Sequence, residues 1–316
     1  MPNLKVGFLP DKGEYPEDQM ASLRVFVERH VSELEVTSVA DAELVFAHHL
    51  QADSVDKLKI VVERADSSTV IHARRFLKDR NVLGLFKHTL LPYELQNLPF
   101  CHRRYHITVL DDVYGLEHPR EPLEPISEEE FSRIKCRGPI FMRYHRKKVP
   151  ELNRFLTPLN CKRTKDIICK GSLQDNLPHV GKHRGTVIGK FGGKANRLLG
   201  MRRWHELLNK SKVCICPWGY GEMCYRDYEA MLSGCVVVKP NTDFVETWPR
   251  IYQAGKTYVT CAVDFSDIHE VCQEILDNYS DYQEMTALNR EQLINPDFEQ
   301  MGREFVHALV DLGVSI

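Results

Sequence analysis

The sequence has no long apolar run, and this absence excludes a membrane-spanning helix. Such a helix needs ~20 consecutive, mostly apolar residues, and no apolar stretch in the 316 residues approaches that length. Residues 1–15, MPNLKVGFLPDKGEY, become polar and acidic too early for a secretory signal peptide. We therefore expect no integral membrane segment and a cytoplasmic protein.

The chain also lacks an excess of charge of either sign. The chain has 42 lysines and arginines against 44 aspartates and glutamates, which gives a formal net charge of -2. This balance creates no whole-molecule field that would attract nucleic acid or an anionic membrane. We therefore expect no nucleic-acid partner.

Patterns that bind metals or triphosphates are lacking as well. The ten cysteines are scattered, and no CxxC pair or His/Cys cluster has the spacing of a zinc site. The run GKFGGK at 189–194 lacks the GxxxxGK[ST] spacing of a P-loop. Reduced, mostly buried thiols and no bound metal are expected.

What the chain does contain is an alternation of strand-like and helix-like segments. This order is typical of doubly wound α/β proteins with parallel sheets. The expected strands are residues 4–9, 34–39, 42–50, 58–64, 81–88, 139–145, 165–172, 195–200, 212–216, 235–240 and 257–263. The expected helices are residues 18–31, 67–80, 183–191, 202–211, 224–233, 268–278 and 296–312. A proline-rich, acidic stretch at 93–130 reads as a surface excursion.

The length allows two domains, each with its own core. We place their boundary near residue 150, after the proline-rich stretch and the segment that follows it. The chain shows no internal repeat and no low-complexity tract.

The densest pattern lies at 212–240, KVCICPWGYGEMCYRDYEAMLSGCVVVKP. A short apolar strand is followed by a glycine loop, a helix and a second strand, with Gly234 where a helix C-cap is expected. In open α/β sheets, ligands bind at the carboxyl ends of strands, where glycine loops meet helix N-termini. The segment places Arg226 and Glu229 near such a point.

These residues resemble the donor-binding half of GT-B glycosyltransferases, and most closely the exostosin-like family. The matching positions are Pro217, Gly219, Gly221, Glu222, Arg226, Glu229, Gly234 and Val236 to Val238. Residues 165–173, with His183 and Arg184, resemble the first strand and loop of the same nucleotide-sugar domain. Residues 81–91 resemble, more loosely, a strand and turn of the N-terminal domain. The resemblance covers roughly residues 58–90 and 160–260.

The resemblance implies two Rossmann-like domains whose parallel sheets face each other across a cleft. Residues 1–150 would form the acceptor-binding domain and residues 151–300 the nucleotide-sugar-binding domain. The terminal helix, within 297–316, would pack back on the N-terminal domain. Members anchored in membranes differ from this chain, which looks like a soluble relative.

Arg226 is the first candidate for binding the diphosphate and stabilising it as it leaves. An arginine in the first turn of a helix beside a glycine loop can fork onto phosphate oxygens. The alternative is a surface arginine paired with Asp227 or Glu229. The resemblance assigns Glu229 to the ribose hydroxyls, and an i,i+3 contact with Arg226 is its alternative.

Further donor-binding candidates surround these two residues. Gly219 and Gly221 would let the backbone approach the donor closely. The other candidates are Lys170, Gly171, Ser172, Arg184, Tyr220 and Glu222, with Lys190 and Lys194 as further cations. Tyr220 or Trp218 could stack on the base or simply pack.

The catalytic base should come from the first domain. Asp11 and Asp66 follow predicted strands and rank first, ahead of His48, His49, Lys87 and His88. Aspartate and histidine can both act as general bases. A polar turn or helix cap is the alternative for each. Six residues separate Glu222 from Glu229, whereas many retaining members have seven between two glutamates, so the spacing favours inversion.

The expected function is transfer of a sugar from a nucleotide sugar, UDP favoured over GDP, to a glycan hydroxyl. No cofactor or metal is expected, because fixed cations replace the metal in this class. Asp111 and Asp112 lack the third aspartate of the DxD pattern that binds manganese in the other main glycosyltransferase fold. A sugar-nucleotide epimerase of the same fold and an inactive nucleotide- or glycan-binding module remain as alternatives.

Overall fold

The computed structural model describes residues 3–9, 16–63, 68–70, 74–98, 104–116, 125–171, 173, 178–191 and 199–316. Asp11, Asp66, Ser172 and Lys194 lie outside the described residues, as does most of the strand expected at 195–200.

The first half of the chain builds a six-stranded sheet in the order β2-β1-β3-β4-β5-β7, with every neighbouring pair parallel. Its strands are β1 (Leu4–Leu9), β2 (Leu34–Val36), β3 (Leu44–His48), β4 (Lys59–Val62), β5 (Val82–Phe86) and β7 (Ile134–Lys135). Every residue of β3 and β4 is buried. Burial on both faces is typical of parallel strands covered by helices on each side.

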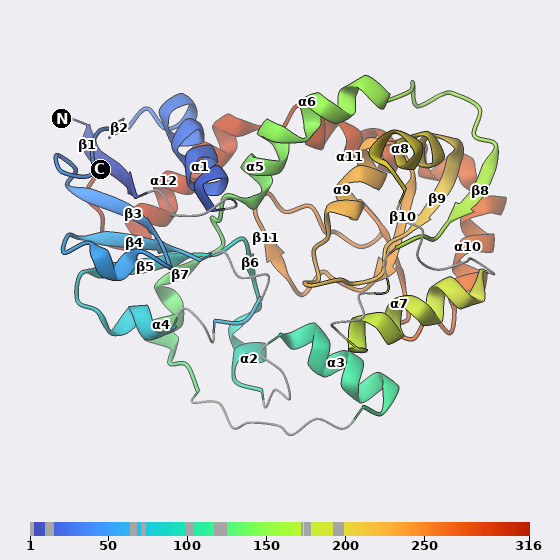
Figure 1. The fold of residues 1–316 in the computed structure, drawn as a ribbon, viewed down its shortest axis with the longest axis horizontal. Helices are drawn as coiled ribbons and strands as arrows, with labels where there is room; N and C mark the ends of the chain where they lie inside the picture. Colours follow the sequence, from blue (N-terminus) through green and yellow to red (C-terminus); the bar gives the residue numbers. More distant parts are fainter. Residues whose placement is uncertain are drawn as a thin grey trace.

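The second half builds a four-stranded parallel sheet in the order β12-β10-β9-β8. Its strands are β8 (Lys165–Ile168), β9 (Ser211–Ile215), β10 (Val236–Pro240) and β12 (Val259–Cys261). The α/β class with two parallel sheets, expected from the sequence, is confirmed. Figure 1 shows the two sheets at opposite ends of the molecule.

Helices cover both sheets. They are α1 (Pro16–His30), α2 (Tyr93–Gln96), α3 (Tyr105–Tyr114), α4 (Glu128–Ser132), α5 (Ile140–Lys147), α6 (Val149–Leu152), α7 (Pro178–Lys190), α8 (Met201–Lys210), α9 (Tyr225–Leu232), α10 (Ile268–Asp277), α11 (Gln283–Ile294) and α12 (Phe298–Asp311). Short 3-10 turns occur at η1 (Ala52–Ser54), η2 (Arg74–Lys78), η3 (Asn153–Phe155) and η4 (Tyr279–Tyr282). No helix in the described ranges is long and apolar enough to cross a bilayer.

Three predictions of secondary structure need correction. The strand expected at 139–145 is helix α5, because Phe141 and Tyr144 lie one turn apart and both pack against Tyr228 of α9. The helix expected at 67–80 is, in its described part, only the 3-10 turn η2. Helix α11 was not predicted. Its buried face includes Asn289, which donates to the carbonyl of Thr257 and interrupts the apolar periodicity.

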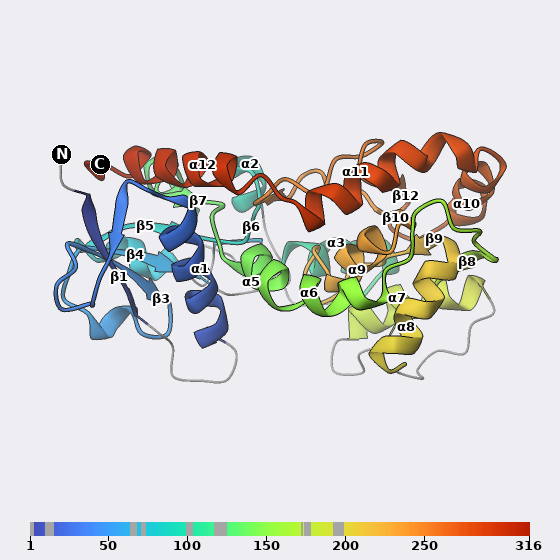
Figure 2. The ribbon, with the colours of Figure 1, turned by 90° about the horizontal axis from the view of Figure 1, so that it is seen from above.

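Two contacts tie the halves together. The terminal helix α12 lies along the first sheet (Figure 2), where the ring of Phe305 is 5.6 Å from Phe46 and 5.3 Å from Phe86. Two short strands, β6 (Thr89–Leu90) and β11 (Glu246–Thr247), pair antiparallel between the halves. Because each contact joins residues far apart in sequence, the halves hold each other in a defined arrangement.

Helix α3 also crosses between the halves. It belongs to the proline-rich stretch of the first 150 residues, but it packs against α7 of the second half, below it in Figure 1. Tyr114 at its end donates a hydrogen bond to the carbonyl of Val263 at 3.4 Å. The surface excursion expected from the sequence therefore includes a helix that covers the second half.

Candidate functional site

The site begins with two arginines from neighbouring elements of the second half. Arg184 lies on α7 and is 5% exposed, and Arg226 lies in the first turn of α9. Burial, followed by the positive charge of Arg226, lowers the pKa of Arg184. Both guanidinium groups stay charged at neutral pH. The fold thus brings two like charges close together, which is unfavourable unless an anion lies between or beside them.

Arg226 has no neutralising partner in the part of the chain that the structure describes. It forms no ion pair there, and its buried Nη1 has no hydrogen-bond partner. Asp227, the next residue, is instead paired with Lys239 at 3.0 Å, with both side chains fully buried. The surface pairing with Asp227, considered from the sequence, does not form.

Glycines allow the arginines to lie against the backbone. A Cβ at Gly171, which follows β8, would lie 2.5 Å from Nη2 of Arg226. A Cβ at Gly219, which follows β9, would lie 2.5 Å from Nη2 of Arg184. Contacts below 3.0 Å are not formed by real side chains, so any larger residue would displace the arginine. Two glycines and two arginines therefore meet at the carboxyl ends of β8 and β9, where α/β proteins bind ligands.

Gly234 confirms the helix end expected from the sequence. Its φ of 73° lies in the left-handed region, and a Cβ there would lie 2.3 Å from Leu159. The backbone turns sharply from α9 into β10 at this point.

Glu229 lies one turn beyond Arg226 and is held by a tryptophan. The indole N–H of Trp204 on α8 donates to Oε2 of Glu229 at 2.8 Å. Burial raises the pKa of Glu229, although the hydrogen bond from Trp204 and the charge of Arg226 oppose this shift. Because Trp204 fixes Oε2 of Glu229, the other carboxylate oxygen is suited to accept hydrogen bonds from a diol.

Glu222 and Tyr220 lie in the same loop but in different surroundings. Glu222 is 1% exposed, and its Oε1 accepts a hydrogen bond from Ser68 at 2.8 Å. Tyr220 is 38% exposed, and its carbonyl accepts from Nη1 of Arg104 at 2.9 Å. Only the tyrosine ring is thus open to a ligand, whereas Glu222 is engaged inside the protein.

Trp218 and the remaining lysines have clear placements. Trp218 is 1% exposed and donates its indole hydrogen to Thr242 at 3.1 Å. Of the two alternatives, stacking on a base or packing, the structure shows packing. Lys170 and Lys190 are exposed. Lys170 directly precedes Gly171, the glycine against which Arg226 lies.

The sequence resemblance includes His183, but it did not predict that this buried histidine supports the loop. His183 accepts from the backbone N–H of Trp218 at Nε2 (3.2 Å), and its Nδ1 lies 3.2 Å from the hydroxyl of Tyr114. Burial, followed by the charge of Lys239, holds the pKa of His183 well below its usual value. The neutral ring with hydrogen on Nδ1 satisfies both contacts. The available signal for this role was the position of His183, which directly precedes the candidate Arg184 in the sequence.

The first-half candidates at strand ends are mostly internal. Lys87 forms an ion pair with Glu63, and both side chains are 1% exposed. His88 is 4% exposed, and His48 is fully buried and accepts from the backbone N–H of Leu50. These three residues are buried, His49 is half-buried, and Asp11 and Asp66 lie outside the described residues.

No group of three or more His, Cys, Asp or Glu side chains within the described ranges could hold a metal. Asp111 of the adjacent pair Asp111–Asp112 lies on α3 and faces His179 of α7 in an ion pair. All nine cysteines in the described part of the chain are free thiols, and Cys161 is exposed.

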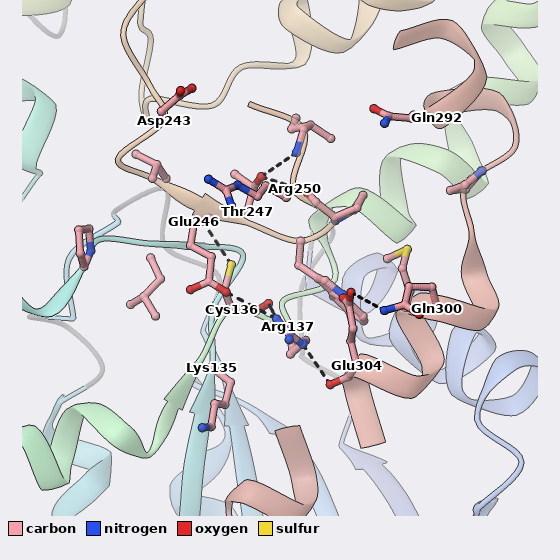
Figure 3. Close-up of a pocket in the computed structure, with 18 of the residues that line it drawn as sticks. Lys135, Cys136, Arg137, Asp243, Glu246, Thr247, Arg250, Gln292, Gln300 and Glu304 are labelled. Carbon is pink, nitrogen blue, oxygen red and sulfur yellow. Dashed lines mark hydrogen bonds and ion pairs between the residues drawn. The ribbon is translucent and has the colours of Figure 1, made fainter. Parts of the chain in front are cut away.

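A cavity of about 1030 Å³ lies at the junction of the halves, with walls from β6, β7, β11 and α12. Figure 3 shows Arg137 and Glu246 facing each other and Glu304 on α12 beside them. Arg137 lies 3.7 Å from Glu246, and Glu304 accepts the indole hydrogen of Trp248 at 2.8 Å. Arg137 and Glu246 are thus engaged with each other, and neither arginine of the candidate site lines the cavity. We therefore place the candidate site at Arg184 and Arg226.

Comparisons with known proteins give limited information. The sequence matches no protein-family model, so the exostosin-like resemblance rests on its motifs. HepE of Anabaena, solved with UDP and glucose, is similar over 98% of this chain and 100% of its own, with 11% identity and a TM-score of 0.45. A putative UDP-N-acetylglucosamine 2-epimerase from Listeria monocytogenes is similar over 98% of this chain and 96% of its own, with 12% identity and a TM-score of 0.43. TarM is similar over 94% of this chain and 59% of its own, with 10% identity and a TM-score of 0.42. None of these likenesses identifies site residues.

Proposed function

We propose that this chain is a metal-independent GT-B glycosyltransferase of the exostosin-like type. It transfers a sugar from a nucleoside diphosphate sugar to a hydroxyl group of a glycan acceptor. The observation that carries the proposal is the convergence of Arg184 and Arg226 on the glycine-lined carboxyl ends of β8 and β9.

Two fixed guanidinium groups match the chemistry of a diphosphate leaving group. Negative charge grows on the diphosphate as the glycosidic bond breaks, and preorganised cations stabilise that charge most strongly in a site with little water. Nη1 of Arg226, buried and without a hydrogen-bond partner among the described residues, is a donor already placed for such an anion. Because two arginines supply the charge, the reaction needs no metal.

The other donor contacts follow from the loop. Glu229, fixed by Trp204, accepts hydrogen bonds from the ribose, and Gly171 and Gly219 let the phosphates approach the backbone. Lys170, Ser172, Tyr220 and Gly221 complete the proposed set of donor-side residues, whereas Glu222, buried against Ser68 and His106, is left out of it. UDP is the favoured nucleotide on the family resemblance.

The proposed reaction inverts the anomeric carbon. A base on the first half takes the proton from the acceptor hydroxyl while the diphosphate leaves toward Arg226. Asp11 and Asp66 are the proposed bases, ahead of the half-buried His49, because the other strand-end candidates His48, Lys87 and His88 are buried.

Thermal unfolding with a panel of nucleotides and nucleotide sugars tests the proposal. A ligand at 100 times its dissociation constant adds about 2.7 kcal/mol to the free energy of unfolding, so a millimolar panel shows which nucleotide binds. The stabilising nucleotide sugar is then incubated with a mixed glycan array, and transfer is measured by mass spectrometry. Absence of any stabilisation by UDP, GDP and their sugars would overturn the proposal.

A further inference from the structure

A buried contact joins three distant segments behind the glycine loop. Glu222, at the end of the loop, lies against Ser68, which follows β4 of the first half, and against His106 of α3. All three side chains are at most 1% exposed. Oε2 of Glu222 has no hydrogen-bond partner among the described residues, so the carboxylate depends on these two neighbours.

Both ring nitrogens of His106 face acceptors. Nε2 lies 3.1 Å from the carbonyl oxygen of Gly219, and Nδ1 lies 3.4 Å from Oε1 of Glu222. A carbonyl and a carboxylate oxygen can only accept hydrogen bonds. Nε2 is therefore placed to donate to Gly219, whereas Nδ1 faces the carboxylate without forming a hydrogen bond among the described residues.

The pKa of Glu222 reflects the groups that surround its carboxylate. Burial alone would raise the pKa of its carboxyl group, but the facing charge of His106 and the hydrogen bond from Ser68 outweigh burial and lower it. The titratable and charged groups packed nearby are Tyr105, His183 and Arg104. Burial, and then Glu222, raise the pKa of Tyr105, and His183 is held neutral. His106 is thus the group that faces the carboxylate directly.

The pair fixes the loop that carries the candidate site. His106 holds the carbonyl of Gly219, the glycine against which Arg184 lies, and Arg104 holds the next carbonyl, that of Tyr220. Ser68 extends the contact into the first half, because its own carbonyl accepts from the backbone N–H of Leu91 at 3.0 Å. The position of the loop is therefore set by α3 and by the first half together.

We propose that His106, Glu222 and Ser68 form a latch that holds the glycine loop in its ligand-binding shape and couples nucleotide binding to the docking of the two halves. His106 acts as a positioning residue, not a catalytic one, because it contacts the loop and not the ligand. The latch itself is a property of the fold, and its effect on nucleotide-sugar binding rests on the proposed function.

Three variants test the latch. His106→Ala removes both contacts, Ser68→Ala removes one hydrogen bond, and Glu222→Gln replaces an acceptor by an amide that can donate to a neutral Nδ1. Nucleotide affinity is measured by calorimetry. We expect about tenfold weaker UDP binding in His106→Ala. Equal affinities in all proteins would overturn the coupling to nucleotide.

A second measurement needs no ligand and separates this inference from the proposed function. Hydrogen exchange of residues 217–224 should be at least tenfold faster in Ser68→Ala and His106→Ala than in the wild type. A double-mutant unfolding cycle between His106 and Glu222 should give a coupling different from zero. If the wild type binds no nucleotide but these two results hold, the proposed function fails and the latch stands. Unchanged exchange together with zero coupling would overturn the latch.

Discussion

The indole N–H of Trp204 on α8 donates a 2.8 Å hydrogen bond to Oε2 of Glu229 on α9. This contact fixes the carboxylate one helical turn from Arg226, although burial raises the pKa of Glu229 and disfavours its charged form. A hydrogen bond to a charged acceptor contributes about 1.5–3 kcal/mol. The tryptophan therefore keeps Glu229 oriented and opposes the rise in its pKa.

Trp204→Phe should weaken nucleotide-sugar binding about tenfold, because Glu229 loses its orientation and its carboxyl pKa rises further. Dissociation constants from calorimetry check the result. The matched control is Trp248→Phe, which removes an indole hydrogen bond of the same 2.8 Å length to Glu304 on the opposite side of the molecule. That variant should lose stability without losing affinity. Equal loss of affinity in both variants would contradict a specific role for Trp204.

Arg226→Ala should lower nucleotide affinity by about 10- to 100-fold, since it removes charged hydrogen bonds to the phosphates. The folded structure should persist, because Arg226 forms no ion pair with the described residues. Circular dichroism and thermal unfolding check the fold, and calorimetry checks the affinity. Arg202→Ala is the control: this exposed arginine on α8 pairs with Glu206, one turn away, and with no other described residue. Arg226→Ala with wild-type affinity would remove this residue from the site.

Gly171→Ala and Gly219→Ala should each weaken nucleotide binding about tenfold. Gly171→Ala should change stability little, whereas Gly219→Ala should also lose stability, because its Cβ would lie 2.8 Å from Sγ of Cys224. In both cases the new Cβ meets the far end of an arginine side chain at 2.5 Å, and the arginine can swing away into the space a ligand would occupy. Gly189→Ala on α7 is the control, because nothing lies within 4 Å of its Cβ position. That variant should raise the free energy of unfolding by about 0.5–1 kcal/mol, as a helical glycine-to-alanine change does. If the arginine is fully displaced, each site variant should bind nucleotide as weakly as Arg226→Ala does. Unchanged nucleotide binding would show that the arginines tolerate displacement.

Acid should destabilise the protein from about pH 6.5 downward, and His183 should account for part of this loss. Its pKa is held well below 6.5 in the folded state. Below that pH the unfolded chain therefore binds a proton that the folded protein does not. Each such group reduces the free energy of unfolding by about 1.4 kcal/mol per pH unit until its folded pKa is reached. Burial also lowers the pKa of His30, His145 and His205, which add to the slope.

Urea unfolding of His183→Gln at a series of pH values measures its share. The variant should show a smaller pH slope than the wild type below about pH 6.5, whatever its stability at neutral pH. His307→Gln, at an exposed position of α12, should leave the slope unchanged. A slope equal to that of the wild type in His183→Gln would show that His183 is protonated in the folded protein.

Local sequence patterns were sufficient for most of the fold. The apolar strands at 212–216 and 235–240, the glycine loop between them and the C-cap at Gly234 are all encoded within a few residues of where they form. The prediction failed where side chains meet distant partners. Residues 139–145 have the apolar content of a strand, but Phe141 and Tyr144 pack on Tyr228 as one face of a helix.

The candidate site shows the same division. Arg226 and Glu229 could be proposed from the motif alone. The sequence could not show that Arg226 lacks a partner among the described residues, because this depends on the ion pair between Lys239 and Asp227. The role of Trp204 and of His106 was also out of reach, since each contacts the loop from an element that only the folded chain brings near.

The sequence by itself determined the α/β alternation and the strand, glycine loop and helix of 212–240, because these depend on short-range periodicity and on residues such as glycine whose preferences are local. Only the tertiary structure decided that Arg184 meets Arg226, that Glu229 is held by Trp204, and that Glu222 lies inside a contact with Ser68 and His106. The physical reason is that charge, burial and hydrogen bonding at a site depend on which distant segments are packed together, and a linear pattern does not contain that information.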